Sequence, residues 1–382
     1  MSDNNLYIGL MSGTSIDGTD VALVNFSGTK CKLVASLNYP ISAEIKNNLC
    51  RLSSAQTKNA NSVFENRVEL MATMDVIMGH LFTDASSTIL NQENLSASDI
   101  KAIGSHGQTI RHRPTNKNPF SIQIGDANII AEKTGITTVA DFRRADIAAG
   151  GQGAPLAPAF HYAVLRNENE NRIILNLGGI ANITFLPKDQ RQSVIGFDTG
   201  PANTLLDAWF KKNQTDSVND FDRDSNLAKK GVIHEALLNN LLSDPFFQLP
   251  YPKSTGREYF SVNWLTTHIE KINTNIKIED IQRTLLELTI QTIADSIKSL
   301  NLINYSLLAC GGGMHNHFLL DLLSEQLKVK VQTTNDFNVD GDYLEAMTFA
   351  WLAKQRLEGK TGNLPSVTGA TKSKVLGAVY SP

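Results

Sequence analysis

The chain has 382 residues, of which 41% are hydrophobic and 19% charged, and its formal net charge is -3. This length and composition predict a globular protein with a substantial core, divided into two domains rather than one. Charged residues of both signs are interspersed, which argues against nucleic acid as a partner. No stretch approaches the roughly 18 uninterrupted apolar residues of a membrane span, and the N-terminus has no secretion signal. We therefore expect a cytoplasmic protein without a membrane partner.

The first part of the chain predicts three strands, then helices and strands in alternation. Apolar runs separated by short polar turns predict the strands, and a three- and four-residue apolar periodicity predicts a long amphipathic helix. A second helix ends at a glycine that can serve as its C-cap. In chain order the expected elements are strands at 6–11, 20–26 and 32–41, a helix within 61–90, strands at 101–110 and 120–126, a helix at 127–135 and a strand at 136–142.

The same order of elements begins again near residue 172. Its members are strands at 172–179, 182–187 and 193–200, helices at 200–212, 226–243 and 281–300, a strand at 307–313, a helix at 314–327, a strand at 329–334 and a helix at 345–357. Two similar halves predict two α/β domains. We expect one domain over 1–150 plus about 365–382 and the other over 151–364, with the boundary in the Gly- and Pro-rich stretch 150–158.

Three glycine-rich turns are the candidates for nucleotide binding. The sequence has no GxxxxGK[ST] motif, and no GxGxxG follows a strand, so neither a P-loop nor a dinucleotide site is expected. Each turn taken alone could be an ordinary turn between elements, but bare backbone amides, hydroxyls and carboxylates also suit phosphates and a hydrated cation. The candidate residues are Gly13, Thr14, Ser15, Ile16, Asp17, Gly18, Thr19 and Asp20 in the first turn, Gly178, Gly179 and Asn182 in the second, and Gly311, Gly312 and Gly313 in the third.

Two β-turn-β segments and a later glycine turn resemble the actin, hexokinase and chaperone ATPase superfamily. More closely, an ordered set of blocks resembles the anhydro-N-acetylmuramic acid kinase family over nearly the whole chain. The blocks are MSGTSIDGTD, GSHGQTI, QIGD, ADFRRADIAAGGQGAPLAP, NLGGIANIT, GFDTGPAN, PKSTGREYF, CGGGMHN and GDYLEAMTFAWLA. The resemblance implies two facing ribonuclease-H-like domains around an active-site cleft. It also implies a reaction in which 1,6-anhydro-N-acetylmuramic acid, ATP and water give N-acetylmuramic acid 6-phosphate and ADP during cell-wall recycling.

The resemblance implies roles for individual residues. Asp198 becomes the general base, although it could instead cap the helix that follows. Asp17 and Asp20 become ligands of Mg²⁺, directly or through water. The first two turns hold the ATP phosphates, and the third turn lines the adenosine site. A homodimer is also expected.

Four further residues are candidates for binding the sugar: His106, Asp126, Arg143 and Glu345. Each has a structural alternative, since His106 could be a satisfied structural histidine and Asp126 or Glu345 a helix cap, while Arg143 could sit in a surface ion pair. The chain departs from the family pattern at Ala202, where GPGN is usual, and at Ala145, where the family has another arginine. Ala202 excludes a backbone conformation reserved for glycine.

Two other functions fit parts of the pattern. An ordinary sugar kinase of the same fold would phosphorylate a free hydroxyl. A nucleotide-switched chaperone, filament or sensor would hydrolyse ATP slowly without any sugar, and would need an interaction surface that the sequence does not reveal. The role of PKSTGREYF stays open.

Overall fold

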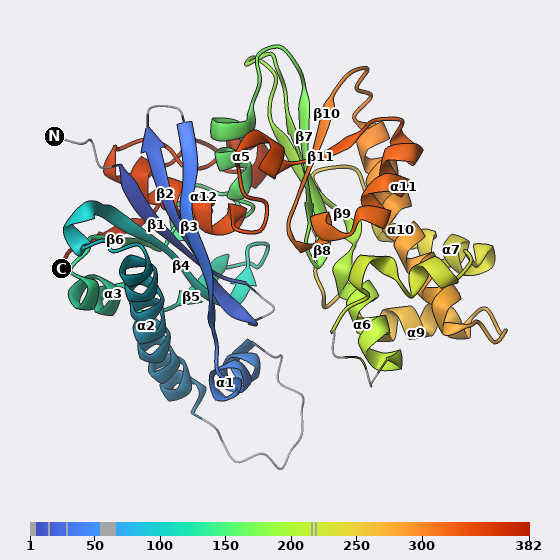
Figure 1. Ribbon diagram of the computed structural model, residues 1–382, viewed down its shortest axis with the longest axis horizontal. Helices are drawn as coiled ribbons and strands as arrows, with labels where there is room; N and C mark the ends of the chain where they lie inside the picture. Colours follow the sequence, from blue (N-terminus) through green and yellow to red (C-terminus); the bar gives the residue numbers. More distant parts are fainter. Residues whose placement is uncertain (1–4, 14–15, 28–29, 54–65, 215–216, 218–219) are drawn as a thin grey trace. The chain divides into compact units, whose positions relative to one another are not determined.

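The computed structural model describes residues 5–13, 16–27, 30–53, 66–214, 217 and 220–382 (Figure 1). The chain forms two compact units. The first unit comprises Met1–Val164 and Tyr343–Pro382, and the second comprises Leu165–Asp342. Among the described residues, no helix has the length and apolar character that a membrane span needs.

The first unit is built on a seven-stranded sheet. Its strands are β1 (Leu6–Ser12), β2 (Gly18–Ser27), β3 (Lys30–Pro40), β4 (Ile100–Arg113), β5 (Phe120–Ile124), β6 (Thr138–Ala140) and β12 (Ala378–Tyr380). The strand order is β12-β6-β4-β1-β2-β3, and β5 pairs with β4. The strands β1, β2 and β3 form an antiparallel meander, and β4 and β6 continue the sheet in parallel with β1.

Helices cover both faces of this sheet. The helices of the unit are α1 (Ala43–Ser53), α2 (Arg67–Gln92), α3 (Ala127–Thr134), α4 (Arg144–Ala148), α5 (Ala157–Leu165), α12 (Leu344–Leu357) and α13 (Pro365–Thr368). Apolar residues of α1 and α2 share a core with Ile8 and Leu10 of β1. In Figure 1 the red helix α12 lies against the blue strands β1 and β2, far from them in sequence.

Two glycines allow α12 to approach the sheet closely. A Cβ atom placed on Gly9 would lie 1.8 Å from the carbonyl oxygen of Ala346, and one on Gly104 would lie 2.0 Å from that of Phe349. Side chains alternate between the two faces of a strand, so Gly9 faces α12 while its neighbours Ile8 and Leu10 face α1 and α2. The absence of side chains at these two positions therefore sets the distance between α12 and the sheet.

The second unit repeats the strand order on a five-stranded sheet. Its strands are β7 (Arg172–Leu177), β8 (Ile180–Leu186), β9 (Ile195–Pro201), β10 (Ser306–Cys310) and β11 (Val331–Thr333), in the order β11-β10-β7-β8-β9. Again three antiparallel strands are followed by two strands parallel to the first. The order found in both units is that of a ribonuclease-H-like domain, which confirms the predicted fold class.

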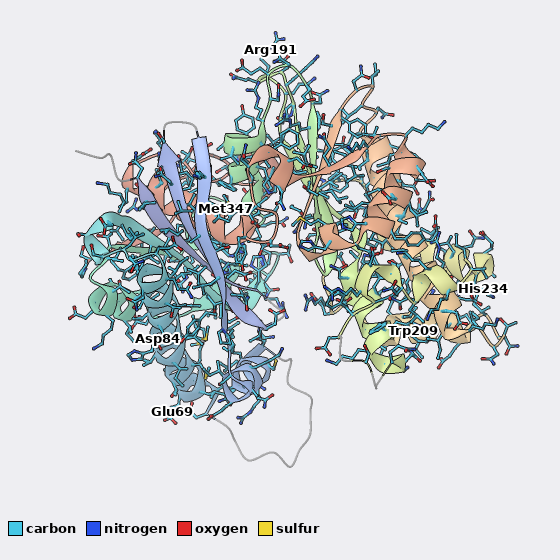
Figure 2. The ribbon with its side chains drawn as sticks, viewed as in Figure 1. Glu69, Asp84, Arg191, Trp209, His234 and Met347 are labelled. Carbon is cyan, nitrogen blue, oxygen red and sulfur yellow. The ribbon has the colours of Figure 1, made fainter. Side chains whose placement is uncertain are left out.

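The helices of the second unit surround one apolar core. They are α6 (Asn203–Asn213), α7 (Glu235–Leu242), α8 (Pro245–Gln248), α9 (Val262–Glu270), α10 (Ile278–Ser299) and α11 (His317–Leu327). The core includes residues from five strands and all six helices. Trp209, labelled on α6 in Figure 2, is buried in this core, and its indole nitrogen donates to the carbonyl of Ile278 at 3.1 Å. This bond joins α6 to the start of α10.

The structure corrects one predicted helix. Instead of one helix over 226–243, the chain forms 3-10 turns at Arg223–Ser225 and Ala228–Lys230, and α7 follows. Gly231 interrupts the helical run because its backbone is extended, with φ -95° and ψ 168°. A Cβ there would lie 2.1 Å from the carbonyl oxygen of Glu279, so this position approaches α10 as only glycine can.

The units also differ in extent from the expected domains. Their junctions lie at 164/165 and 342/343 rather than at 150 and about 365. The reason for the second difference is α12, which packs on β1, β2 and β4. The closing strand β12 pairs antiparallel with β6 at Val379 and Val139.

Candidate active site

The first glycine turn, between β1 and β2, is fastened to β4 by a buried glutamine. The Oγ of Ser12 donates to Oε1 of Gln108 at 2.6 Å, and Nε2 of Gln108 donates to the carbonyl of Gly13 at 3.3 Å. Ser12 and Gln108 are both 1% exposed. Gln108 thus fixes the start of the turn, a contact that the motif itself gives no sign of. The candidates Thr14 and Ser15 lie outside the described residues.

The other members of this turn divide into buried and accessible groups. Ile16 and Thr19 are buried, so their side chains face the core of the first unit. Asp17 is exposed, and Asp20 is partly exposed. Asn38 donates from Nδ2 to Oδ1 of Asp20 at 2.7 Å. The two carboxylates are therefore the groups in the described part of the turn whose side chains suit a ligand.

The second glycine turn, Gly178 and Gly179, lies between β7 and β8 and is bonded to the start of α6. The carbonyl of Gly178 accepts from the amide of Asn203 at 3.1 Å, and that of Gly179 accepts from Thr204 at 3.0 Å. Asn182 follows on β8, where its register partner on β9 is Asp198. Directly opposed residues of antiparallel strands place their side chains on one face about 5 Å apart. The second turn and Asp198 are thus parts of one local structure.

The third glycine turn borders a cavity of about 710 Å³ within the second unit. Gly311 has φ 77°, a conformation that favours glycine, and a Cβ on Gly312 would meet no atom within 4 Å. Bare backbone is therefore open to the cavity at Gly312. The residues around the cavity include Asn203, Asp207, Phe221, Asp222, Gly313 and Asn316. Its size suits a drug-sized organic ligand such as a nucleoside.

Asp198 is held by the segment that follows the cis-proline Pro252. Its amide donates to the carbonyl of Lys253 at 3.0 Å, and its Oδ2 accepts from the amide of Thr255 at 2.8 Å. Burial raises the pKa of Asp198 to about 6, while the Thr255 amide and the charge of Lys253 act in the opposite direction. Asp198 lies inside β9 and does not cap α6. It is a partly buried carboxylate with unusual basicity.

Asp207, which the sequence analysis did not single out, also has a strongly shifted pKa. It lines the cavity from α6, and burial raises its pKa to about 7. The positive charge of Arg257 lowers this pKa, and the charges of Asp222 and Asp220 raise it further. In the sequence, Asp207 is an ordinary polar residue within the predicted helix 200–212. Nothing in that pattern indicates a cavity.

All four predicted sugar-binding residues belong to the first unit, and three of them, His106, Arg143 and Glu345, interact with one another. Nε of Arg143 donates to Nε2 of His106 at 3.0 Å, and Nη1 donates to the carbonyl of Gly153 at 2.7 Å. Burial lowers the pKa of Arg143 to about 10, while the negative charges of Glu345 and Asp146 raise it. Desolvation by the surrounding protein raises the pKa of Glu345. The positive charge of Arg143 lowers this pKa, and the negative charge of Asp20 raises it. Arg143 therefore links His106 to Glu345, and the carboxylates of Asp20 and Asp146 act on the same group of side chains.

His106 is a neutral, satisfied histidine. Burial and the charge of Arg143 hold its pKa well below the usual range. Because Nε2 accepts from Arg143, the proton lies on Nδ1, which donates to the carbonyl of Gly107 at 2.8 Å. Its ring also packs against Phe349 with centroids 4.6 Å apart. His106 therefore has hydrogen-bond partners on both ring nitrogens and orients Arg143, and it also lines a polar cavity of about 320 Å³ in the first unit.

Asp126 caps α3, as its structural alternative stated. Its Oδ1 accepts from the amide of Asn128 at 2.8 Å. It also lines a polar cavity of about 320 Å³ in the first unit, together with Asp75, Ser105 and His106. The cap uses only the Oδ1 oxygen of its carboxylate.

The structure describes both positions at which the chain departs from the family pattern. Ala202 has φ -125° and ψ -112°, so its φ is negative but its ψ lies outside the usual helical and extended ranges, and it is 1% exposed. Ala145 stands in α4 between Arg144, which pairs with Asp141 at 3.5 Å, and the buried Asp146. Ala202 therefore does not use the left-handed region that favours glycine, and Ala145 is a helical position.

A cluster of three or more metal-binding side chains is absent from the part of the chain that the structure describes.

Comparison with known proteins identifies the family. The family model described as anhydro-N-acetylmuramic acid kinase matches residues 5–382. The chain is 52% identical over 377 residues to the enzyme of that name from Coxiella burnetii, covering 98% of this chain and 97% of the relative. It is 46% identical to the enzyme from Aliivibrio fischeri, covering 98% of each.

The chain also resembles solved structures at low sequence identity. The activator of 2-hydroxyisocaproyl-CoA dehydratase from Clostridium difficile is 12% identical, with a TM-score of 0.45, and covers 93% of this chain and 97% of its own. No conclusion rests on a likeness of that size. The sequence relatives and the family model together leave one assignment: the chain belongs to the anhydro-N-acetylmuramic acid kinase family.

Proposed function

We propose that Asp198 is the general base with which this kinase activates water against 1,6-anhydro-N-acetylmuramic acid. The observation that carries the proposal is the state of its carboxylate. One oxygen is held by the Thr255 amide, and burial raises the pKa to about 6. A base with a pKa just below neutrality is mostly ionised at pH 7 and yet more basic than an ordinary aspartate.

In the proposed step, the proton of water passes to Asp198 while the water oxygen bonds to the anomeric carbon. The bond from that carbon to the bridging O6 breaks, and O6 bonds to the γ-phosphorus of ATP as ADP leaves. In a glycosidase a second carboxylic acid would protonate the leaving oxygen. Here phosphorus takes the place of that proton, so one carboxylate is enough.

The glycine turns divide the binding of ATP. The turns at Gly13 to Asp20 and at Gly178 to Asn182 hold phosphates, and Gly311 to Gly313 line the adenosine site in the cavity of the second unit. Asp17 and Asp20 would hold Mg²⁺, directly or through water, and the ion would neutralise charge on the phosphate oxygens. Asn38 supports this assignment because its hydrogen bond orients the carboxylate of Asp20.

Arg143 is assigned to the lactyl carboxylate of the sugar. Its Nε donates to His106 and one hydrogen of Nη1 donates to the carbonyl of Gly153, so Nη2 and the second hydrogen of Nη1 are the donors that can meet a carboxylate. Glu345 and Asp126 accept from hydroxyl or amide groups of the sugar. We assign the protein to the cytoplasm, where ATP is available, and expect a homodimer, which sedimentation of the purified protein tests.

The deciding experiment compares ADP release with four sugars. We expect stimulation by 1,6-anhydro-N-acetylmuramic acid and little by N-acetylmuramic acid, N-acetylglucosamine or glucose. In ¹⁸O-labelled water the label should enter the anomeric position during turnover, faster than spontaneous exchange of the product measured in parallel. An ordinary sugar kinase would phosphorylate a free hydroxyl and incorporate no label, and a nucleotide switch would ignore the sugar.

A further inference from the structure

We propose that Arg257 contacts the phosphoryl group that this kinase transfers, and that the segment 253–257 joins this contact to Asp198. The inference rests on the proposed function, since it takes the second glycine turn as a phosphate-binding turn. It gives a role to Arg257 in the block PKSTGREYF, of which the proposed mechanism uses only the Thr255 amide.

The segment 253–257 is attached to Asp198 through its backbone. The carbonyl of Lys253 accepts from the amide of Asp198 at 3.0 Å, and the amide of Thr255 donates to its carboxylate at 2.8 Å. The segment therefore fixes both the main chain and one carboxylate oxygen of Asp198. Any movement of this segment would also move the group assigned as base.

An aromatic cluster anchors the segment to the core of the second unit. The ammonium of Lys253 lies 4.7 Å from the ring centroid of Phe246 and donates to the carbonyl of Phe246 at 3.2 Å. Beyond the segment, Phe260 is fully buried and packs edge-on against Phe246, with centroids 5.4 Å apart. Asp244 completes the anchor by accepting from the hydroxyl of Tyr259 at 2.8 Å. Lys253 thus serves to hold the segment.

Arg257 lies against the second glycine turn. A Cβ atom placed on Gly179 would lie 2.9 Å from Nε and 3.0 Å from Nη2 of Arg257. The same Cβ would lie 2.5 Å from Oγ1 of Thr204, a buried hydroxyl that has no hydrogen-bond partner among the described residues. A guanidinium and an unsatisfied hydroxyl therefore converge on the backbone of Gly179. Such an arrangement suits an anion with several oxygens.

The charge of Arg257 also reaches the nucleotide cavity. Arg257 is exposed, and its positive charge lowers the pKa of Asp207, which lines that cavity. Arg257 itself is not among the residues around the cavity. A nucleotide whose base occupies the cavity would extend its phosphates toward the second glycine turn, where the guanidinium lies.

Phosphoryl transfer spreads negative charge over the oxygens of the group in flight, and a planar guanidinium offers paired donors to two of them. Removing one preorganised donor of this kind typically costs 10²- to 10³-fold in turnover. The expected contribution is therefore to kcat more than to the binding of ADP, which lacks the transferred group.

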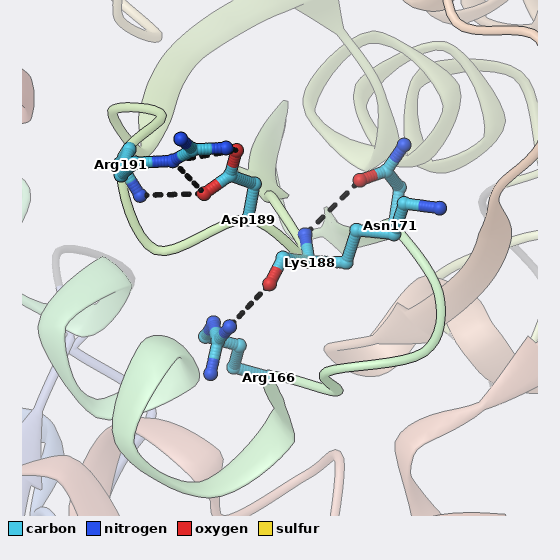
Figure 3. Close-up of polar contacts among 5 residues, drawn as sticks. All are labelled: Arg166, Asn171, Lys188, Asp189 and Arg191. Atoms are coloured by element: carbon cyan, nitrogen blue, oxygen red, sulfur yellow. Dashed lines mark hydrogen bonds and ion pairs between the residues drawn. The ribbon is translucent and has the colours of Figure 1, made fainter.

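The test compares Arg257→Gln with Arg191→Gln. Arg191 is an exposed arginine of the same unit, paired with Asp189 at 2.7 Å in the loop after β8 that Figure 3 shows. We expect Arg257→Gln to lower kcat about 10²-fold while its affinity for ADP stays within about threefold of wild type. Arg191→Gln should match wild type in both. In Arg257→Ala, added guanidinium ion should restore part of the turnover.

Two results would overturn the inference. One is turnover of Arg257→Gln within about threefold of Arg191→Gln. The other is an equal loss of kcat and ADP affinity that neither guanidinium ion nor the variant Arg257→Lys relieves. A purely structural role for Arg257 would lower kcat and ADP affinity together. Wild-type protein that shows no stimulation by the anhydro sugar would instead refute the proposed function, before any variant is compared.

Discussion

Asp198 joins a raised basicity to a fixed orientation, and the two properties can be separated by a single substitution. Asp198→Asn keeps an oxygen that can accept from the Thr255 amide but loses the charge that removes a proton from water. We expect turnover to fall roughly 10²- to 10⁴-fold while ATP and sugar still bind. In wild type, kcat/KM should also decrease below about pH 6, where the carboxylate of the free enzyme becomes protonated. Near-normal turnover of the variant would remove Asp198 from this role.

Asp207 should make stability depend on pH. Its pKa in the folded protein, about 7, lies above the ordinary value of 3.8, so between these values the folded state keeps a proton that the unfolded chain has lost. Stability therefore falls as pH rises through this window. Asp207→Asn carries no such charge, so its melting temperature relative to wild type should increase from pH 5 to pH 8. The exposed Asp84→Asn serves as the control, and an identical difference at both pH values for Asp207→Asn would contradict the expectation.

The sequence motifs were informative about residues that are near each other in the chain. Gly178, Gly179 and Asn182 lie beside Asp198 because a short antiparallel meander carries them all. Contacts between distant segments were not predictable in this way. Gln108 fastens the first turn from β4, and Arg257 lies on Gly179 from a later loop. Neither pairing leaves a periodic or compositional signal.

At the level of elements, the approach of α12 to the sheet is the most sensitive feature of the first unit. In Gly104→Ala the new Cβ would meet the backbone carbonyl of Phe349 at 2.0 Å, and a backbone cannot rotate away as a side chain can. We expect a loss of about 3 kcal/mol, toward the upper end of overpacking costs. The urea midpoint of the nucleotide-free protein measures it, with Gly312→Ala as the control, because no atom lies within 4 Å of a Cβ there. Equal midpoints would show that α12 can shift at no cost.

Whether a segment forms a helix or a strand was predicted better than which other element it packs against. The apolar pattern of EAMTFAWLA identified a helix, now α12, whose Phe349 and Trp351 are buried. The pattern did not reveal which sheet the helix covers, because an apolar stripe packs on any apolar face. The two glycines that receive it, Gly9 and Gly104, stand in strands where a glycine would by itself indicate only a weak or bulged position.

For the whole molecule, the repeated element order was sufficient to predict two ribonuclease-H-like units, because the order of strands and helices can be inferred from the apolar patterns of successive segments. The extent of each unit was predicted only in part. The return of about 365–382 to the first unit was expected, but the returning segment begins at Tyr343, so α12 also joins the first sheet. The return depends on a buried polar contact as well as on apolar packing.

Asp146 provides that contact. It is fully buried in α4, and its carboxylate accepts from the amide of Gly153 at 2.7 Å, from Nδ2 of Asn363 at 2.6 Å and from Oγ1 of Thr368 at 2.7 Å. The last two donors belong to the returning segment. Asp146→Ala would leave all three donors buried without this acceptor, which should cost roughly 3–5 kcal/mol.

The same substitution should loosen the C-terminal segment before the rest of the protein unfolds. We expect amide hydrogen exchange to accelerate most over residues 363–380, and a protease to cleave there in Asp146→Ala at a concentration that leaves wild type intact. Asp84→Ala is the matched control, since Asp84, labelled on α2 in Figure 2, is exposed. If exchange in 363–380 were no faster than in this control, apolar packing of α12 and β12 alone would hold the returning segment, and the buried carboxylate would have to act within α4 and the Gly153 loop.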